Sequence, residues 1–347
     1  MATYALLPKA SANRVYGEAS FGLAAAELAL VDEHVLGHVV VGVERTELGG
    51  VGYLLVDCGD RALDDEAVAV LSNLSVLHAL FAVEGDLLRP LVVGPIQRQD
   101  DDVTTIQRYA GKTNEALTHL LVNLALAVTA DGFPRLRAGE AVRLLDPACG
   151  RGTTLNRAVV YGIDAVGVEH DQRDLEAYSA FFLGWLQDKR LKHEVQRATL
   201  RKGRASPAHR TTVTYGRGKE RSAHRVVDLV HDDTVAARDH LAARSIDLLV
   251  CDLPYGVQHG STPAAGVLQR SPDELLAAAL PAWRDLLRPG AGMALAWNLR
   301  TLPRATLVAR LADAGLELCV PPADPRFEHR VDRSIQRDVV VARRPPA

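Results

Sequence analysis

Cysteine is scarce in this chain and never closely spaced. The four cysteines, at positions 58, 149, 251 and 319, are separated by long stretches of the 347-residue sequence. No C-x-x-C pair occurs, so the sequence predicts neither a zinc site nor a framework of disulfides, and we expect no bound metal. Reduced thiols of this kind are typical of the cytoplasm, which is therefore the expected location.

Long apolar runs are also missing. No stretch reaches the roughly 18 uninterrupted apolar residues of a membrane-spanning helix. The opening residues MATYALLPKASANR lack the basic and apolar regions of a signal peptide. The sequence thus predicts neither a membrane span nor a signal peptide. Hydrophobic residues make up 48% of the chain, enough for a large core and two domains, whereas the oligomeric state is left open.

Lysine provides only six of the forty basic residues, and the net charge is −3. The arginine bias suits phosphate binding, but richness in Ala, Arg, Leu and Val throughout the chain is also typical of a GC-rich genome. Between Gln187 and Arg225 there are twelve basic and three acidic residues, or +9, which leaves −12 for the remainder. A basic block in an otherwise acidic protein indicates a polyanionic partner.

The first hundred residues mix two periodicities. A Gly-Gly turn flanked by apolar stretches predicts two strands within 38–59, and a further strand is expected at 76–86. Helical spacing of apolar residues occurs in 22–31 and 64–74. We therefore expect residues 1–100 to form a small α+β domain, a candidate for binding the substrate.

A linker and a helix are expected across residues 101–140. The polar stretch at 97–107 is typical of a linker, and its aspartates at 100–102 are interpreted as solvated rather than as metal ligands. Apolar residues then recur at helical spacing over 112–130, with Thr113 or Asn114 as the N-cap.

From residue 141 to the end, strands and helices alternate. This alternation predicts a mostly parallel, doubly wound sheet, that is, a Rossmann-like α/β domain over 141–347 with a basic insertion at about 189–225. The last two apolar stretches, 316–320 and 334–344, are expected to close the sheet as an antiparallel pair. The expected strands are 142–146, 164–169, 225–233, 245–252 and 292–298, and the expected helices are 153–162, 174–189, 272–290 and 304–315.

The stretch LLDPACGRGTTL (144–155) joins the first of these strands to its helix. In open α/β sheets ligands bind at the carboxyl ends of the strands, and Gly150 and Gly152 would let the backbone approach a ligand closely. Asp146, at the tip of the strand, could accept hydrogen bonds from an amine. The turn, which includes Ala148, is therefore predicted to bind a cofactor.

Two further acids follow at the ends of the next strands. Glu169 lies 23 residues after Asp146, close to the spacing of roughly 20 residues at which an acid binds ribose hydroxyls. Asp233 ends the third strand and could contact an adenine amine. A ligand with an amino-acid group, a ribose and an adenine fits these positions, and S-adenosylmethionine (SAM) is the predicted cofactor. The GKT at 111–113 is no phosphate-binding loop, because Ile106 replaces the glycine that such a loop requires.

DLPY (252–255) ends the fourth strand and is expected to face the same crevice. The exocyclic amine of a base is a poor nucleophile because its lone pair is delocalised into the ring. Asp252 and the carbonyl of Pro254 could each accept one N–H, which would favour a pyramidal nitrogen, and Tyr255 could stack on the base. These three residues are the predicted catalytic group, because positioning supplies much of the acceleration in such a transfer.

Together the two motifs resemble those of class I SAM-dependent amino-methyltransferases. DPACGRGTTL resembles the cofactor motif, and DLPYG resembles the catalytic D/N-P-P-Y motif, with Leu253 in place of the first proline. The likeness covers roughly 112–300 and is greatest to the tRNA guanosine-N2 methyltransferases, which often carry a THUMP domain. In that family a helix with a threonine near its start precedes the cofactor motif. The resemblance implies that Thr113 and Asp252 also border the cofactor.

The basic block is predicted to form a β-hairpin that carries Tyr215 among its arginines. Arg201, Lys202 and Arg204 would bind an RNA backbone, and the alternative is a solvated insertion. His259, soon after the catalytic motif, is a candidate substrate contact, although an exposed loop histidine is the simpler interpretation. The segment 327–334 could line the entrance or form a plain surface turn.

These observations predict a SAM-dependent N-methyltransferase that acts on a nucleobase amine in RNA, namely guanine N2 in tRNA. Adenine-N6 methylation of DNA or rRNA is the main alternative, because aspartate occurs at the motif in both kinds of enzyme. Methylation of a protein glutamine is disfavoured since Asp252 replaces the usual asparagine, and a small-molecule substrate would leave the basic block without a role. The complete set of acids and glycines disfavours a methylase relic that binds RNA without catalysis.

Overall fold

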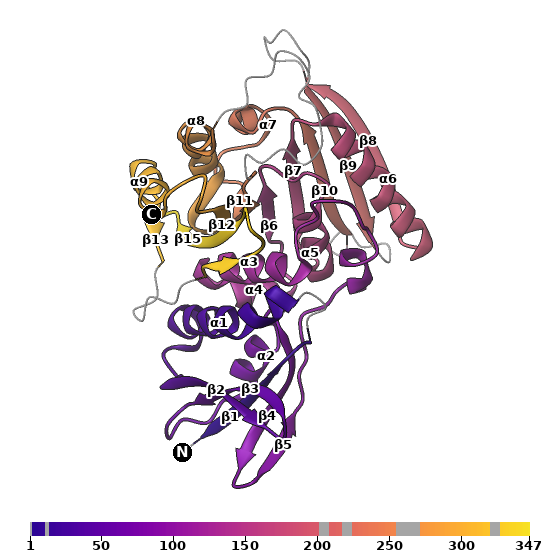
Figure 1. Ribbon diagram of the computed structural model, residues 1–347. Helices are drawn as coiled ribbons and strands as arrows, with labels where there is room; N and C mark the ends of the chain where they lie inside the picture. Colours follow the sequence, from indigo (N-terminus) through magenta and orange to yellow (C-terminus); the bar gives the residue numbers. More distant parts are fainter. Residues whose placement is uncertain (1, 11–13, 201–207, 217–223, 255–270, 320–326) are drawn as a thin grey trace.

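The computed structural model describes residues 2–10, 14–200, 208–216, 224–254, 271–319 and 327–347. Within these residues the strands form two sheets, a smaller one from the first hundred residues and a larger one from the rest of the chain. Figure 1 shows the smaller sheet below the larger one, with α3 and α4 between them.

The smaller sheet is antiparallel throughout, in the order β2-β3-β1-β4-β5. The predicted Gly-Gly turn joins β2 to β3, and both glycines have positive φ (57° and 80°), as a two-residue hairpin turn favours. Asp64 caps α2 by accepting a hydrogen bond from the N–H of Ala67 (2.8 Å). The elements are β1 (Thr3–Pro8), α1 (Arg14–Val31), η1 (Asp32–Leu36), β2 (Gly42–Leu48), β3 (Val51–Asp57), α2 (Asp65–Leu71), β4 (Leu77–Glu84), β5 (Leu87–Leu91) and η2 (Asp101–Thr104).

The larger sheet has the order β13-β15-β12-β11-β6-β7-β10-β9-β8. Five central strands are parallel, and β15 and β13 close one edge in antiparallel pairs, as expected. The chain builds outward from β6 to β7 and β10, and then returns to β11 and β12 on the other side. This reversal between β6 and β11 is the switch point where an open α/β sheet forms its ligand crevice. The elements are α3 (Glu115–Val128), α4 (Gly132–Ala138), β6 (Arg143–Asp146), α5 (Thr153–Tyr161), β7 (Asp164–Glu169), α6 (Gln172–Asp188), β8 (Lys192–Leu200), β9 (Ala208–Gly216), β10 (His224–His231), η4 (Thr234–Ala236), α7 (Ala237–His240), β11 (Ile246–Asp252), α8 (Pro272–Leu286), β12 (Leu287–Asn298), α9 (Arg304–Asp313), β13 (Glu317–Leu318), β14 (His329–Arg330) and β15 (Gln336–Arg343).

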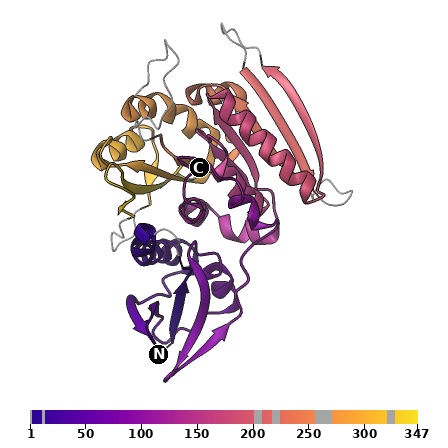
Figure 2. The ribbon, with the colours of Figure 1, turned by 45° about the vertical axis from the view of Figure 1, so that its right-hand side comes forward.

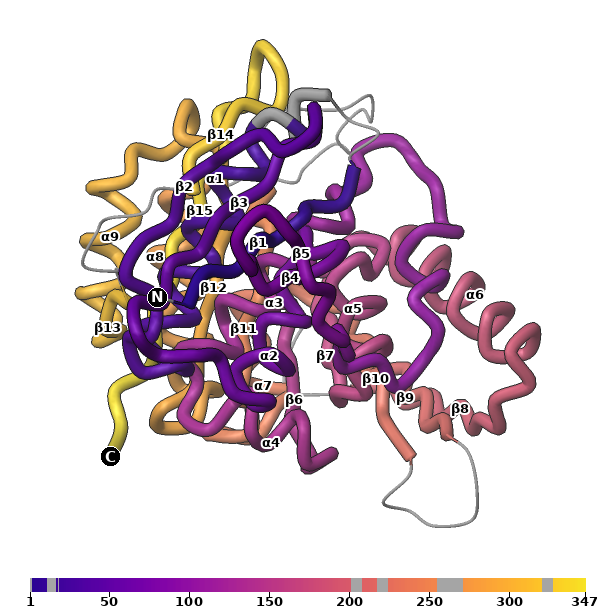
Figure 3. Tube along the Cα trace, turned by 90° about the horizontal axis from the view of Figure 1, so that it is seen from below, coloured from indigo at the N-terminus to yellow at the C-terminus, as the bar shows by residue number. Residues whose placement is uncertain are grey.

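Helices cover both faces of this sheet, which confirms the predicted Rossmann-like α/β architecture. The apolar side chains of α3, α5 and α6 form one core that continues without a break into the smaller sheet, and α7, α8 and α9 pack into a second core on the opposite face. Twelve of the fourteen residues of α3 are buried, because this helix is covered from both sheets. Figure 3, seen from below, shows the strands of the smaller sheet in front of α3.

A buried polar network joins α1, α3 and α5. The carboxylate of Glu27 accepts hydrogen bonds from the Ser75 hydroxyl (2.6 Å) and the Asn123 amide (2.7 Å). The amide oxygen of Asn123 accepts from the Tyr161 hydroxyl (2.6 Å), which also lies 2.6 Å from Nε2 of His119. Burial raises the pKa of Glu27 to about 7. Buried polar groups that satisfy one another in this way fix how their helices pack.

The basic block forms the predicted hairpin, but as part of the larger sheet. β8 and β9 pair in antiparallel fashion, and β9 pairs along its length with β10. Figure 2 shows α6 lying along this extension of the sheet. The alternative of a solvated insertion is therefore wrong for these two strands. Tyr215 lies in the hairpin as predicted, but its side chain is buried against the ring of Phe182 and is therefore not available to an RNA.

The linker around residue 100 is more ordered than the sequence suggests. Asp102 accepts a hydrogen bond from the Trp185 indole N–H (3.0 Å), and Nζ of Lys189 lies 2.6 Å from Asp102 and 2.9 Å from Asp100. Asp100 and Asp102 thus attach the linker to the end of α6 and are not merely solvated, whereas Asp101 is exposed as expected. Asn114, and not Thr113, caps α3.

In the described part of the chain no single helix is long and apolar enough to cross a membrane. Only α3 and α4 taken together, with a bend of 106° between them, reach the required length and composition.

Candidate active site

Two carboxylates lie at the switch point of the larger sheet. Asp146 is the last residue of β6, and Asp252 is the last residue of the neighbouring parallel strand β11. The carboxyl ends of parallel strands meet at one edge of a sheet. The two motifs singled out in the sequence therefore come together here, close enough for the charge of Asp252 to act on Asp146.

The turn after Asp146 depends on two glycines with positive φ. Gly150 has a φ of +49°, and a Cβ built on it meets nothing within 4 Å, so this side of the turn has room for a ligand. Gly152 has a φ of +77°, and a Cβ there would lie 2.4 Å from the Tyr178 ring, so any other residue would be strained and crowded. Tyr109 contacts the same turn, with its hydroxyl 2.8 Å from Oγ1 of Thr153.

Glu169 connects the glycine turn to the start of α6. One carboxylate oxygen accepts from the N–H of Gly150 (2.9 Å), and the other accepts from the N–H groups of His170 (2.9 Å) and Asp171 (3.0 Å). Burial would raise the pKa of Glu169, but the hydrogen bonds from His170 and from these backbone groups outweigh it and hold the pKa below its ordinary value. The carboxylate is therefore ionised and fixed in orientation at the strand end.

Asp146 is buried, and its environment opposes ionisation. Burial raises its pKa to about 7, and the negative charges of Glu169 and Asp252 act in the same direction. Hydrogen bonds from the side chain of Thr154 and from the N–H of Ala148 (3.1 Å) oppose this rise without cancelling it. A cation placed beside this carboxyl group would strongly stabilise its ionised form.

The carboxylate of Asp252 is held from two distant parts of the chain. The hydroxyl of Thr113, two residues before α3, donates to Oδ2 (2.8 Å), and Nη2 of the buried Arg337 in β15 lies 3.7 Å from the same oxygen. The N–H of Leu253 donates to the carbonyl of Ala296 (2.8 Å), which a proline at this position could not do. Leucine in place of the first proline of the resembled motif thus allows one more backbone hydrogen bond between the end of β11 and β12.

Two further predicted residues, Asp233 and Pro254, lie in the described part of the chain. Asp233 lies two residues beyond the end of β10, not at its end as expected, and its side chain caps η4 by accepting from the N–H of Val235 (3.0 Å). Pro254 is exposed, directly beyond Leu253. Five predicted residues lie outside the described part of the chain: Tyr255, His259, Arg201, Lys202 and Arg204.

Three side chains near the site were not identified from the sequence: Tyr109, His170 and Arg337. Nδ1 of His170 lies 2.8 Å from the Glu169 carboxylate, and this hydrogen bond is the main cause that raises the pKa of the imidazole. Of the three, only His170 could have been identified from the sequence, because it directly follows Glu169, the acid that ends β7. Tyr109 and Arg337 reach the site from polar segments far from either motif.

The strand order and the acids at the switch point define a class I methyltransferase fold. Residues 119–284 match the family model described as UPF0020: RMKL-like, methyltransferase domain. This class of enzyme takes its methyl group from SAM. The predicted SAM-dependent methyltransferase is therefore confirmed, whereas the guanosine-N2 family remains a proposal.

Comparison with known proteins adds distant similarities. TrmN from Thermus thermophilus is 14% identical, with 99% of each chain covered and a TM-score of 0.44. An rRNA methylase from Streptococcus thermophilus is 10% identical, with 68% of this chain and 99% of that chain covered and a TM-score of 0.37. A TehB-like SAM-dependent methyltransferase from Corynebacterium glutamicum is 15% identical, with 60% and 85% covered and a TM-score of 0.35. No curated protein matches the chain.

The described residues fit SAM as the cofactor. The open side of the turn at Gly150 gives its backbone access to a ligand, and the fixed carboxylate of Glu169 can accept from ribose hydroxyls. Asp146 is a buried acid that a cationic amine would stabilise in its ionised form.

Raising the pH from 6 to 8 is expected to tighten SAM binding by roughly tenfold. The folded, cofactor-free protein keeps a proton on Asp146 up to about pH 7, whereas the unfolded chain loses it near the ordinary value of 3.8. The cofactor-free fold therefore loses stability as the pH rises through that interval. A cation beside Asp146 favours the ionised form, so binding below pH 7 should release a proton. Calorimetry in two buffers of different ionisation enthalpy measures both effects. Asp146→Asn should remove most of the dependence, and an equally steep dependence in that variant would exclude this assignment.

Thr113→Val is expected to lower kcat by about tenfold while the affinity for SAM stays within about threefold, because the lost hydrogen bond orients Asp252. Thr113→Ser, which keeps the hydroxyl, should restore most of the rate. Measuring kcat and SAM affinity in the same variants distinguishes the two possible roles of Thr113, which are to orient Asp252 or to contact the cofactor. A large loss of SAM affinity with little change in kcat would instead support the cofactor contact that the resemblance implied.

Proposed function

We propose that this protein methylates the exocyclic amine of a nucleobase in RNA, namely N2 of guanine in tRNA. The observation that carries the proposal is the position of Asp252. Its carboxylate ends the strand next to the cofactor strand, held by Thr113 and Arg337, and is followed by Leu253, Pro254 and an aromatic residue.

The chemistry follows from the two acceptors offered by this segment. The Asp252 carboxylate and the Pro254 carbonyl would each accept one N–H of the amine, so that the nitrogen lone pair is directed away from both. Bound SAM supplies an electrophilic methyl group. Arg337 and Thr113 keep the carboxylate in the orientation that the amine requires. The ring of Tyr255 would stack on the base, and the amine can release its proton after transfer, so no base of high pKa is needed.

The charge distribution favours RNA over a small molecule as the substrate. The hairpin block carries +9, as counted above. In contrast, the first hundred residues contain six basic and fourteen acidic residues, a net charge of −8. A polyanion is attracted to the hairpin edge of the larger sheet and repelled by the charge of the smaller unit. We therefore propose that RNA approaches from the hairpin side.

The direct test compares modified nucleosides in total tRNA from a deletion strain and its parent. Loss of N2-methylguanosine in the deletion strain is the expected result. Loss of N6-methyladenosine from rRNA or DNA would replace the proposed target with the adenine alternative. An unchanged profile of methylated nucleosides in all three nucleic acids would contradict the proposal.

A further inference from the structure

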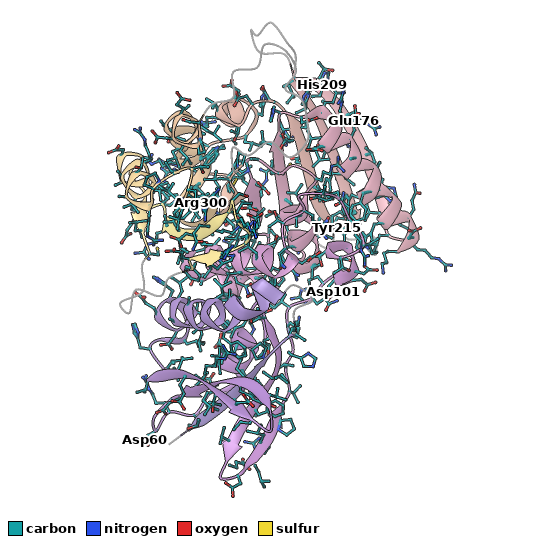
Figure 4. All side chains as sticks on the ribbon, in the orientation of Figure 1. Asp60, Asp101, Glu176, His209, Tyr215 and Arg300 are labelled. Atoms are coloured by element: carbon teal, nitrogen blue, oxygen red, sulfur yellow. The ribbon has the colours of Figure 1, made fainter. Side chains whose placement is uncertain are left out.

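A groove lies between α6 and the β8–β9 hairpin. It has a volume of about 440 Å³ and is bordered by the first three turns of α6 and by β8, β9 and β10. Figure 4 shows His209 and Glu176, which border the groove, toward the upper end of the hairpin and of α6, with Tyr215 lower down. At the end of β10, Nε2 of His231 is 3.0 Å from the carbonyl of His170. Because His170 directly follows Glu169, the groove adjoins the cofactor end of the sheet.

The lining combines apolar, aromatic, polar and basic groups with one acid, Glu176, which accepts a hydrogen bond from the side-chain amide of Gln172 (2.6 Å). Leu175, Leu183 and Leu229 contribute apolar surface, and the rings of His209 and His231 are nearly parallel, 6.2 Å apart at 10°. The volume lies within the range of about 300–1,000 Å³ that is usual for small-ligand pockets. Unpaired nucleotides are bound in this manner, by a flat ring against aromatic side chains and a cation at the phosphate.

The cation of the groove is Arg197 in β8. Side chains of a strand alternate between its two faces. Arg197 therefore shares the α6 side of the hairpin with Thr211, its partner in β9. Arg210 also borders the groove, but its guanidinium is bound to Asp228. Among the described residues, no carboxylate lies within ion-pair distance of Arg197, so its charge is available to an anion.

We propose that this groove holds an unpaired nucleotide of the RNA substrate, with its base against His209 and its phosphate at Arg197. The inference rests on the proposed RNA methyltransferase function and adds a second place at which the RNA is held. β9 and β11 are separated by four strand spacings in the sheet, or about 19 Å at the usual spacing. The nucleotide in the groove is therefore not the one that is methylated, and its binding sets which nucleotide reaches Asp252.

The charge of the groove is tested by a matched pair of variants in β8. Arg197→Ala and Lys192→Ala each remove one positive charge from the same strand, but Lys192 lies on the opposite face of the hairpin and does not border the groove. With unmodified tRNA as the probe, Arg197→Ala should weaken binding about fivefold to tenfold and reduce the slope of log K against log salt by about 0.7–0.9. Lys192→Ala should bind within about twofold of the wild type. Equal effects of the two substitutions would overturn the proposal.

The space in the groove is tested without a change of charge. Ala180 is an exposed residue of α6 that borders the groove, so Ala180→Trp fills it without disturbing the core, and Ala180→Ser is the control of small size. The tryptophan variant should lose at least about tenfold in tRNA affinity while its Tm and SAM affinity match those of the wild type. If the wild type binds tRNA and Ala180→Trp binds it equally well, the groove proposal fails and the RNA function stands. If the wild type itself binds no RNA, both fail.

Discussion

Replacing Asp252 with alanine is expected to abolish methyl transfer while leaving the affinity for SAM within about threefold of the wild type. In the proposed mechanism the carboxylate accepts an N–H of the substrate amine, and the alanine side chain offers no acceptor in its place. Loss of one such group that positions and polarises a reacting atom typically costs about 10²–10³-fold in rate. Transfer from labelled SAM to unmodified tRNA, followed by nucleoside analysis, measures the effect.

The controls for this prediction lie in the same segment. Asp252→Asn should be milder, because an amide oxygen can still accept one N–H. Tyr255→Phe should keep most of the activity since stacking needs only the ring, whereas Tyr255→Ala should lose it. Full activity of Asp252→Ala would exclude the mechanism. A product of N6-methyladenosine would retain the mechanism and exclude the substrate.

Replacing Glu169 with alanine is expected to weaken SAM binding by at least about 100-fold. The two ribose hydroxyls would lose a charged acceptor, and each such hydrogen bond contributes roughly 1.5–3 kcal/mol. The variant also frees the N–H of Gly150, which the carboxylate holds in the cofactor-free protein. Calorimetric titration with SAM measures the loss.

The matched control is Asp174→Ala. Asp174 binds Arg151, the residue between the two glycines, through a hydrogen bond of 2.8 Å, so this variant removes an acid that braces the same turn from its solvent side. Its affinity for SAM should change by no more than about threefold. If Glu169→Ala keeps the wild-type affinity, the carboxylate does not bind the ribose.

The larger sheet was predictable because its strands carry strong local signals. Each central strand is an apolar run, and Asp146, Glu169 and Asp252 mark where three of them end. The cofactor turn was equally accessible, since glycines with positive φ leave a direct trace in the sequence. The class of enzyme followed from these local features alone.

Contacts between distant segments were not predictable in the same way. Thr113 and Asp252 are 139 positions apart, and nothing in either segment specifies the other. Arg337 lies at the polar start of a strand whose remainder is an apolar run, and nothing in that pattern shows that its guanidinium reaches the site. The burial of Tyr215 depends on α6 covering one face of the hairpin, which is a property of packing and not of the strand. The order of the strands in the smaller sheet likewise depends on pairing choices that periodicity does not encode.

Helix α3 is covered from both sheets, and this has a consequence for protein engineering. This helix contributes to the core of the catalytic sheet and, through Asn123, to the polar network with Glu27. A shortened chain beginning near residue 101 would remove Glu27 and the Asn73 carbonyl, the two acceptors of the Asn123 amide N–H groups, and leave that amide and the surrounding leucines of α3 facing water. The catalytic half is therefore not a module that can be excised or fused to another binding domain at the linker. Any exchange of the first hundred residues must also supply a new surface for α3.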